Sequence, residues 1–154
     1  MNLKKLPEAS IVVKAIAELL VSNEKSDDFE KRYLKKEKLD YTIASLKHID
    51  EYLEHVRKKR SNLSQEQLTT IILRCGAYSG EVIKKNIDKN FSWSERDKDV
   101  IKEFGESVLT IYTLQGKETK TVIFPMAKVE KFLPNGKTDS IYFYAQVLLE
   151  DHKN

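Results

Sequence analysis

The stretch from Ser64 to Ile87 constrains the fold most strongly, because it carries the signals of one long helix and yet contains two glycines. Ser64 followed by Gln67 matches a capping box, in which the two side chains satisfy free backbone N–H groups at the start of a helix. Gly76 and Gly80 then lie in mid-helix, where each glycine costs about 1 kcal/mol relative to alanine. Close packing or a ligand must offset this cost.

Apolar and small residues cover more than half of the circumference of this helix. They recur at helical spacing and are Leu68, Ile71, Ile72, Cys75, Ser79, Val82 and Ile83, with Leu73, Gly76 and Gly80 on one flank. A helix with so wide an apolar arc packs on more than one side. We therefore predict an α+β fold in which helices surround a central helix at about residues 64–88, with a small antiparallel sheet (a hairpin at about 107–124) and a C-terminal helix.

Two further helices are predicted before the central one. Pro7 opens the first, where its missing N–H costs nothing, and apolar residues at helical spacing continue it to about Ser22. The second has a narrow apolar seam of Leu46, Ile49, Leu53 and Val56 and ends in the basic run 57–60. The polar segment 24–38 between them is either a short exposed helix or a mobile linker, so residues 1–40 form a helical N-terminal extension of a single domain that spans residues 1–154.

After the central helix the character of the sequence changes. Residues 91–105 predict a short helix with Ser94 as its cap and Gly105 as its end. The β-forming runs 108–113 and 121–124, with a glycine-containing loop between them, predict the hairpin, and Pro125 is expected to end its second strand. Residues 138–149 fit a helix at one spacing and a strand at another. We favour a helix from about Thr138 to Leu149, because Thr138, Asp139 and Ser140 are all good cap residues.

The composition is that of a folded domain with a heavily charged surface. Hydrophobic residues make up 40% of the 154 residues and charged residues 33%, with a net charge of +3. No apolar run approaches the roughly 20 residues needed to span a bilayer, so we expect no membrane partner. The single cysteine, Cys75, fits a reducing compartment, and we expect a cytoplasmic protein.

The stretch from Leu46 through Val82, together with Phe124-Pro125, Val129 and Asn135-Gly136, resembles an uncharacterised family of small bacterial proteins. The marker of that family is a helix with the pattern Gly-Ala-Tyr-x-Gly-Glu-Val, which here is residues 76–82. The resemblance covers about two-thirds of the chain and implies an α+β fold with a C-terminal helix. It implies no activity.

The candidate binding residues gather around the two glycines. They are Gly76, Tyr78, Gly80, Glu81, Trp93 and, from the C-terminal helix, Tyr142. Gly76 and Gly80 share one helix face, so that face is either a packing notch, filled for example by Trp93, or a groove for a small molecule or peptide. Glu81 is either in a surface ion pair with Lys85 or a partly buried anchor beside Tyr78.

Aromatic residues stand in a row at Tyr142, Phe143 and Tyr144, and three successive side chains on a helix cannot all face one core. At least Tyr142 or Phe143 should be exposed, either as a hot spot for a protein partner or as a partial lid over neighbouring loops.

The residues show no catalytic set, no metal site and no cofactor motif. His48, Glu51 and His55 share a helix face, but that face is opposite the apolar seam and should be solvated. Cys75 is predicted to be a small buried hydrophobe.

Three hypotheses for function follow, of which the first is a non-enzymatic domain that binds an unidentified protein partner, for example as an immunity or antitoxin-type protein. The second is a small-molecule-binding domain or minor enzyme that uses a cleft beside Gly76 and Gly80, with Tyr78 and Glu81 as polar anchors. The third, nucleic-acid binding through residues 31–38 and 57–60, ranks last because acidic neighbours dilute the basic charge.

Overall fold

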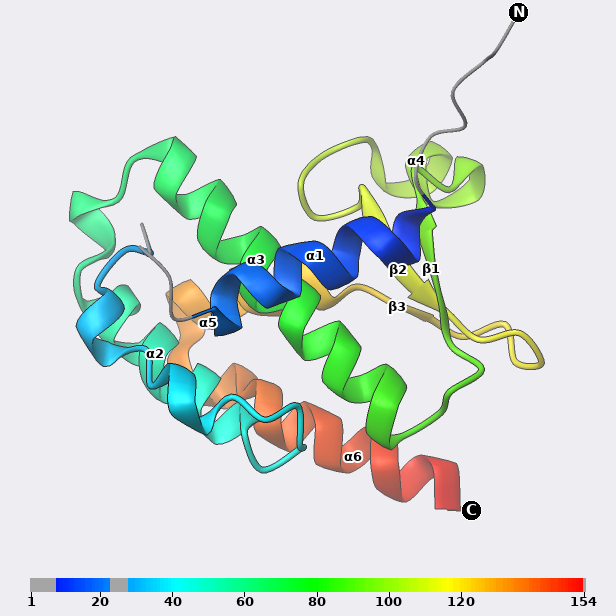
Figure 1. Cartoon of the computed structure of the whole chain (residues 1–154). Coiled ribbons are helices and arrows are strands. Elements are labelled where there is room, and N and C mark those ends of the chain that lie inside the picture. Colours follow the sequence, from blue (N-terminus) through cyan, green and yellow to red (C-terminus); the bar gives the residue numbers. More distant parts are fainter. Residues whose placement is uncertain (1–7, 23–27, 154) are drawn as a thin grey trace, which may run out of the picture.

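The computed structural model describes residues 8–22 and 28–153, and its helices account for most of the chain (Figure 1). The α-helices are α1 (Ala9–Val21), α2 (Leu46–Lys58), α3 (Gln65–Asn86), α4 (Lys98–Phe104), α5 (Pro125–Asn135) and α6 (Ile141–Lys153). The strands are β1 (Ser92–Glu95), β2 (Tyr112–Gln115) and β3 (Val122–Ile123). Short 3₁₀ turns occupy Lys31–Tyr33, Lys36–Lys38, Arg60–Asn62 and Gly136–Asp139.

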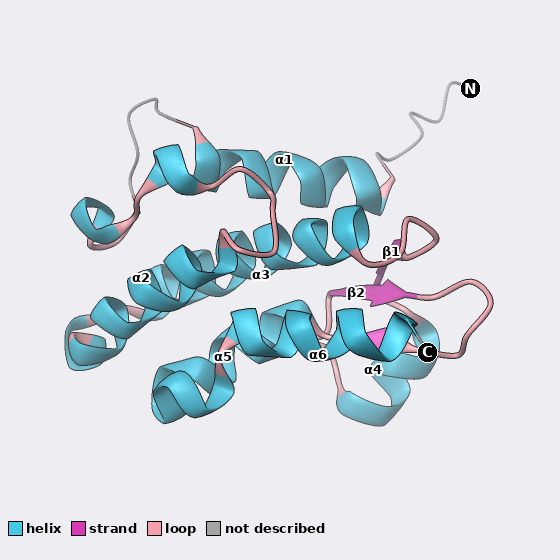
Figure 2. Ribbon diagram, turned by 90° about the horizontal axis from the view of Figure 1, so that it is seen from below, coloured by secondary structure: helices cyan, strands magenta, loops and turns pink. Residues whose placement is uncertain are grey.

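Helix α3 is the centre of the fold, as predicted. Its first turn is closed by the capping box, in which Ser64 Oγ accepts from the Gln67 N–H and Gln67 Oε1 accepts from the Ser64 N–H. Figure 2 shows α1 on one side of α3 and α5 and α6 on the other, and α3 contacts all three. The helix is therefore covered on two sides, which explains its wide apolar arc.

The sheet is antiparallel, has the strand order β1-β2-β3 and lies at one end of the helices (Figure 1). Its register places Trp93 opposite Leu114 and Leu114 opposite Ile123. The hairpin of β2 and β3 was predicted, but its first strand begins only at Tyr112, because residues 107–111 turn through hydrogen bonds to Ser107.

The prediction for residues 91–105 was wrong at its start. Ser92–Glu95 form strand β1 instead of leading into a helix capped by Ser94. Helix α4 begins later and is capped by Asp97, whose carboxylate accepts from the N–H groups of Asp99 and Val100. It ends at Gly105, as predicted, where a φ of 80° suits a residue without a side chain.

The segment after α1 is tied to α3 by charge. Asp28 is buried and accepts from Lys36 at 3.0 Å and from Arg74 of α3 at 2.8 Å. The part of the predicted linker that the structure describes therefore contains short 3₁₀ turns held to the central helix. Residues 23–27 lie outside the described residues, as does Pro7 with its expected place at the start of the first helix.

The C-terminal segment is a helix and not a strand. Helix α6 begins at Ile141, and Ser140 Oγ accepts from the Phe143 N–H, which makes Ser140 the cap among the three predicted candidates. Thr138 and Asp139 belong to the preceding 3₁₀ turn. Helix α5, which the spacing of apolar residues did not reveal, begins at Pro125 and packs on α3.

One apolar core joins the helices and the inner face of the sheet. Its largest fully buried side chains include Tyr52, Tyr78, Phe91, Phe132 and Met126. Cys75 is completely buried, as predicted. None of the helices in the described part of the chain is both long and apolar enough to cross a membrane.

Candidate functional site

The face of α3 that carries the two glycines is filled by its neighbours. A Cβ on Gly76 would lie 2.9 Å from Met126 Cγ and 3.0 Å from Met126 Cα, so α5 approaches the α3 backbone closely there. A Cβ on Gly80 would overlap the indole ring of Trp93. Both glycines are therefore explained by close packing. Of the two alternatives for this helix face, the packing notch filled by Trp93 is confirmed and the open groove is not.

The position of Trp93 on Gly80 also decides where Glu81 points. With no side chain at Gly80, the indole lies against α3, and its Nε1–H donates to Glu81 Oε2 at 3.2 Å. The expected ion pair with Lys85 is absent among the described residues, so that alternative is wrong. Glu81 is half-buried and is held by Trp93 from the neighbouring strand.

Tyr78 lies inside the molecule and joins α3 to the loop before α2. Its hydroxyl is 2.6 Å from Ser45 Oγ and accepts from the Tyr41 N–H at 3.0 Å. Burial raises the pKa of Tyr78, and these hydrogen bonds oppose the shift only in part. Tyr78 is fully buried, and the ring of Tyr41 lies 4.9 Å from its own.

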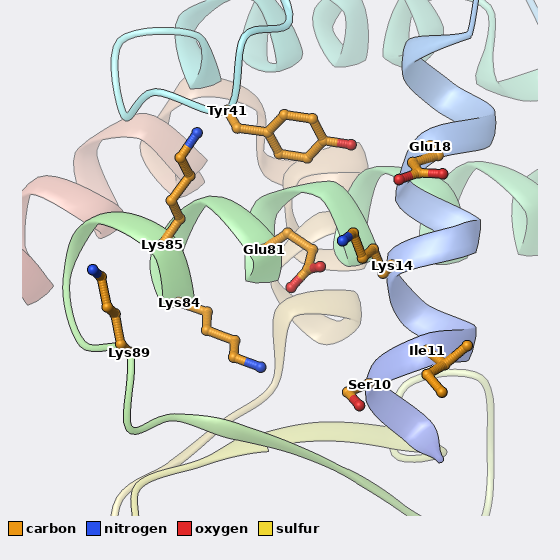
Figure 3. A pocket seen from close by; sticks show the side chains of 9 residues that line it. All are labelled: Ser10, Ile11, Lys14, Glu18, Tyr41, Glu81, Lys84, Lys85 and Lys89. Carbon is orange, nitrogen blue, oxygen red and sulfur yellow. The ribbon is translucent and has the colours of Figure 1, made fainter. Parts of the chain in front are cut away.

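A groove of about 570 Å³ lies between α1 and the second half of α3, and we call it the basic groove (Figure 3). Helix α1 contributes Ser10, Ile11, Lys14 and Glu18 to its lining. The opposite wall consists of Glu81, Lys84 and Lys85 from α3, with Lys89 and Tyr41 beside them. Of the six candidate residues from the sequence, only Glu81 lines this groove.

The basic groove holds more positive than negative charge. Its four lysines face two carboxylates, those of Glu18 and Glu81, and no ion pair among the described residues includes any of the four. Lys85 Nζ lies 5.9 Å from the centre of the Tyr41 ring, at the outer limit of a cation–π contact, and its charge adds to the hydrogen bonds that lower the pKa of Asp40. The ammonium groups are therefore available to an anion.

Tyr41 holds an unusual backbone conformation at the rim of this groove. Its φ of 62° is left-handed, which is uncommon for a bulky residue. The conformation is fixed on both sides, since Tyr41 N–H donates to Tyr78 Oη and Tyr41 O accepts from Asn86 Nδ2 at 2.8 Å. Burial, with the nearby carboxylates of Glu18 and Glu81, raises the pKa of Tyr41 to about 12, so the phenol stays a hydrogen-bond donor at neutral pH.

A second groove, of about 470 Å³, lies between the end of α4, β3, α5 and the start of α6, and we call it the apolar groove. Its apolar lining consists of Phe104, Leu109, Val122, Phe124, Ala127 and Tyr144. Phe104 and Phe124 meet edge to face with ring centres 5.3 Å apart. Lys128 and Lys131 of α5 stand at its polar side, where Lys128 pairs with Asp139 at 3.3 Å.

The three successive aromatic residues of α6 separate as predicted. Phe143 is 64% exposed, whereas Tyr144 turns into the apolar groove and Lys128 lies over its ring. Tyr142 turns the other way, towards α2, where Lys47 Nζ is 4.9 Å from its ring centre. Sequence reasoning chose Tyr142 as the candidate, but Phe143 is the more exposed of the two.

The remaining candidates from the sequence have structural roles. The ring of His55 stacks on Tyr33 with centres 3.8 Å apart, and His48 Nδ1 lies 3.7 Å from a Glu51 carboxylate oxygen. No group of three or more metal-ligating side chains occurs among the described residues. Cys75 is completely buried, and burial raises the pKa of its thiol far above its usual range, which disfavours the nucleophilic thiolate form.

No protein-family model matches the sequence, and neither a curated protein nor a solved structure is found to be similar to it. The resemblance to an uncharacterised bacterial family therefore stays a prediction.

Proposed function

We propose that this chain is a non-enzymatic protein-binding domain and that its partner docks on the apolar groove. The observation that supports the proposal most is that exposed apolar side chains line this groove and continue along α6 beside its lining residue Tyr144. Of the six large hydrophobic residues exposed in the described part of the chain, Phe104 (58%) and Val122 (38%) line the groove. Phe143 (64%) and Val147 (41%) are one turn apart on α6, and Val147 follows the lining residue Tyr144 by three positions.

Such a surface is typical of an interface core. Exposed aromatic side chains next to a concave pocket are where binding energy concentrates, and a polar rim surrounds them. Lys131, an exposed lining residue of α5, provides the cation on this rim. The expected partner therefore presents apolar side chains to the groove and an acidic side chain to Lys131. Inhibition of a toxin by an immunity or antitoxin-type protein is one form that this function would take.

The two other hypotheses receive less support. The cleft that small-molecule binding needed beside Gly76 and Gly80 is occupied by Met126 and Trp93. The basic clusters that nucleic-acid binding needed are in part engaged with acidic residues. The pairs are Lys35–Glu51, Lys36–Asp28, Arg57–Glu54 and Lys59–Glu30.

Photo-crosslinking tests the proposal. A benzophenone amino acid is placed at Phe104 or Phe143 of the full chain, in the cells that produce it, and at Lys117 or Glu66 as exposed controls. We expect one protein to be crosslinked from both apolar positions and from neither control. With the partner purified, Phe143→Glu should weaken binding by about 30-fold, the effect of losing a hot spot of about 2 kcal/mol. Lys117→Glu should change the affinity by no more than about twofold.

Equal crosslinking at all four positions would contradict the proposal. So would a Phe143→Glu variant that binds the purified partner as tightly as the original chain.

A further inference from the structure

We infer that the basic groove binds a small phosphorylated ligand whose phosphate group lies beside hydroxyl groups, as in a sugar phosphate or a nucleotide. The groove is distinct from the apolar groove, and the two share no lining residue. Its volume of about 570 Å³ is in the range of small-molecule sites, about 300–1,000 Å³.

The cations come from both walls of the groove (Figure 3). Lys14 points from α1 towards Glu81, and Lys84 points from α3 towards the α1 side of the groove. Lys85 points towards Tyr41, and Lys89 lies just beyond the end of α3. Since none of them is paired with a described carboxylate, their mutual repulsion is relieved when an anion binds between the walls. A phosphate monoester carries up to two negative charges and three acceptor oxygens, which suits several ammonium donors at once.

The other polar groups fit hydroxyl groups and not a second phosphate. One oxygen of Glu81 is engaged by Trp93, and the other is left to accept from a ligand hydroxyl. Tyr41 and Ser10 add a phenol and an alcohol to the same lining. Glu18 and Glu81 repel further phosphates, so this mixture of charges favours a compact ligand over the backbone of a nucleic acid.

The hydroxyl-binding groups are fixed before any ligand arrives. The ring of Trp93 packs on Gly80, and its Nε1–H donates to Glu81 Oε2, which fixes the Glu81 carboxylate. Tyr41 is held in its left-handed conformation by Tyr78 and Asn86, and such backbone strain is concentrated at ligand sites in proteins. A ligand that binds these groups loses little affinity to ordering them.

Isothermal titration with ribose 5-phosphate, inorganic phosphate and ribose tests the inference on the full chain. We expect ribose 5-phosphate to bind at least about tenfold more tightly than inorganic phosphate or ribose. Only ribose 5-phosphate can contact both the lysines, through its phosphate, and the hydroxyl-binding groups, through its sugar. Adenosine 5′-monophosphate, in parallel, distinguishes a nucleotide from a sugar phosphate as the source of this chemistry.

Substitutions distinguish the contribution of the hydroxyl-binding groups from that of the phosphate-binding lysines. Glu81→Gln keeps an acceptor for Trp93 and removes the charge that holds a hydroxyl, so it should weaken ribose 5-phosphate about tenfold and leave inorganic phosphate unweakened. Lys84→Met with Lys85→Met should weaken both phosphates by about tenfold or more. The matched controls Lys117→Met and Glu118→Gln, in the exposed loop between β2 and β3, should change neither.

Three results would overturn the inference. They are equal binding of inorganic phosphate and ribose 5-phosphate, a Glu81→Gln variant that binds ribose 5-phosphate unchanged, and tighter binding of a short RNA or an acidic peptide through the same lysines. The result is separable from the protein-binding proposal, since Phe143→Glu should leave ribose 5-phosphate binding intact.

Discussion

Single residues in the stretch 76–82 have separate tasks, and each task is explained by what the residue touches. Gly76 admits the backbone of α5, and Gly80 admits the ring of Trp93. Tyr78 supports Tyr41 from inside the molecule, and Glu81 accepts from Trp93 at the edge of the basic groove. The glycine cost inside the helix is thus offset by close packing.

Replacement of Gly80 by alanine tests this packing. The added Cβ overlaps the ring of Trp93, so the ring must move even though alanine favours the helix. We expect a loss of about 2 kcal/mol in the free energy of unfolding, typical of overpacking in a core. Trp93 is the one tryptophan in the sequence, so its fluorescence reports the displacement directly. The emission should move to longer wavelength and become more accessible to a soluble quencher.

Glu66→Ala, on the exposed side of the same helix, is the control for this variant. It should leave the emission spectrum unchanged. If the spectrum and the stability of Gly80→Ala both equal those of the original chain, Trp93 does not lie on Gly80 and the explanation of Glu81 fails with it.

The N-terminus of α6 is held by a neighbouring element. Asp50 of α2 is buried, and its carboxylate accepts from Ser140 Oγ at 2.5 Å and from the Ile141 N–H at 2.9 Å. Burial raises the pKa of Asp50, although the hydrogen bonds from Ser140 and α6 and the charge of Lys137 oppose the shift. The folded chain therefore binds a proton at Asp50 more firmly than the unfolded chain does.

This shift makes the contribution of Asp50 to stability fall as pH rises. Between the ordinary carboxyl pKa of 3.8 and the raised value, the folded state holds more protons than the unfolded state. The free energy of unfolding of the original chain, relative to Asp50→Asn, should decrease as pH rises from below 3.8 towards neutrality. Urea unfolding of both chains over that range measures the difference.

Asp40 supplies a comparison of opposite sign. Hydrogen bonds from Thr42 lower the pKa of Asp40, so stability relative to Asp40→Asn should instead increase as pH rises through this range. An Asp50 difference that stays constant or increases with pH would show that hydrogen bonding, and not burial, dominates at this carboxyl.

Elements with strong local signals were predictable from the sequence. The capping box and the repeated apolar spacing marked α3, and the choice of caps decided α6. Strand β1 was missed because it is only four residues long, with Trp93 as its single buried side chain. Helix α5 was missed because Pro125 at its first position was interpreted as the end of a strand, whereas proline also suits the start of a helix.

The two grooves, by contrast, belong to the whole molecule and had no local signal. The basic groove joins Lys14 to Lys84, which are 70 positions apart in the sequence, and the apolar groove joins Phe104 to Tyr144. The lining residues of each groove come from several helices and strands, so no periodic pattern along one element reveals them. Glu81 was found because it lies within the glycine motif, while Tyr41 and Phe104 had no feature that set them apart from other aromatic residues.

At the scale of the whole molecule, both grooves depend on α3 as a rigid centre, with α1 on one side and α5 and α6 on the other (Figure 2). Residues Cys75–Gly80 of α3 are buried without interruption. Their amide groups should be exposed only when the entire fold opens.

Native-state amide hydrogen exchange is the most direct test of this central claim. If α3 is the rigid centre of the molecule, amides in the middle of α3 should exchange most slowly, with an opening free energy equal to that of global unfolding measured in urea. Exchange in the middle of α3 that is faster than exchange in α1 or α6 would show that α3 is not the rigid centre, because the helix would then open while its neighbours stay folded.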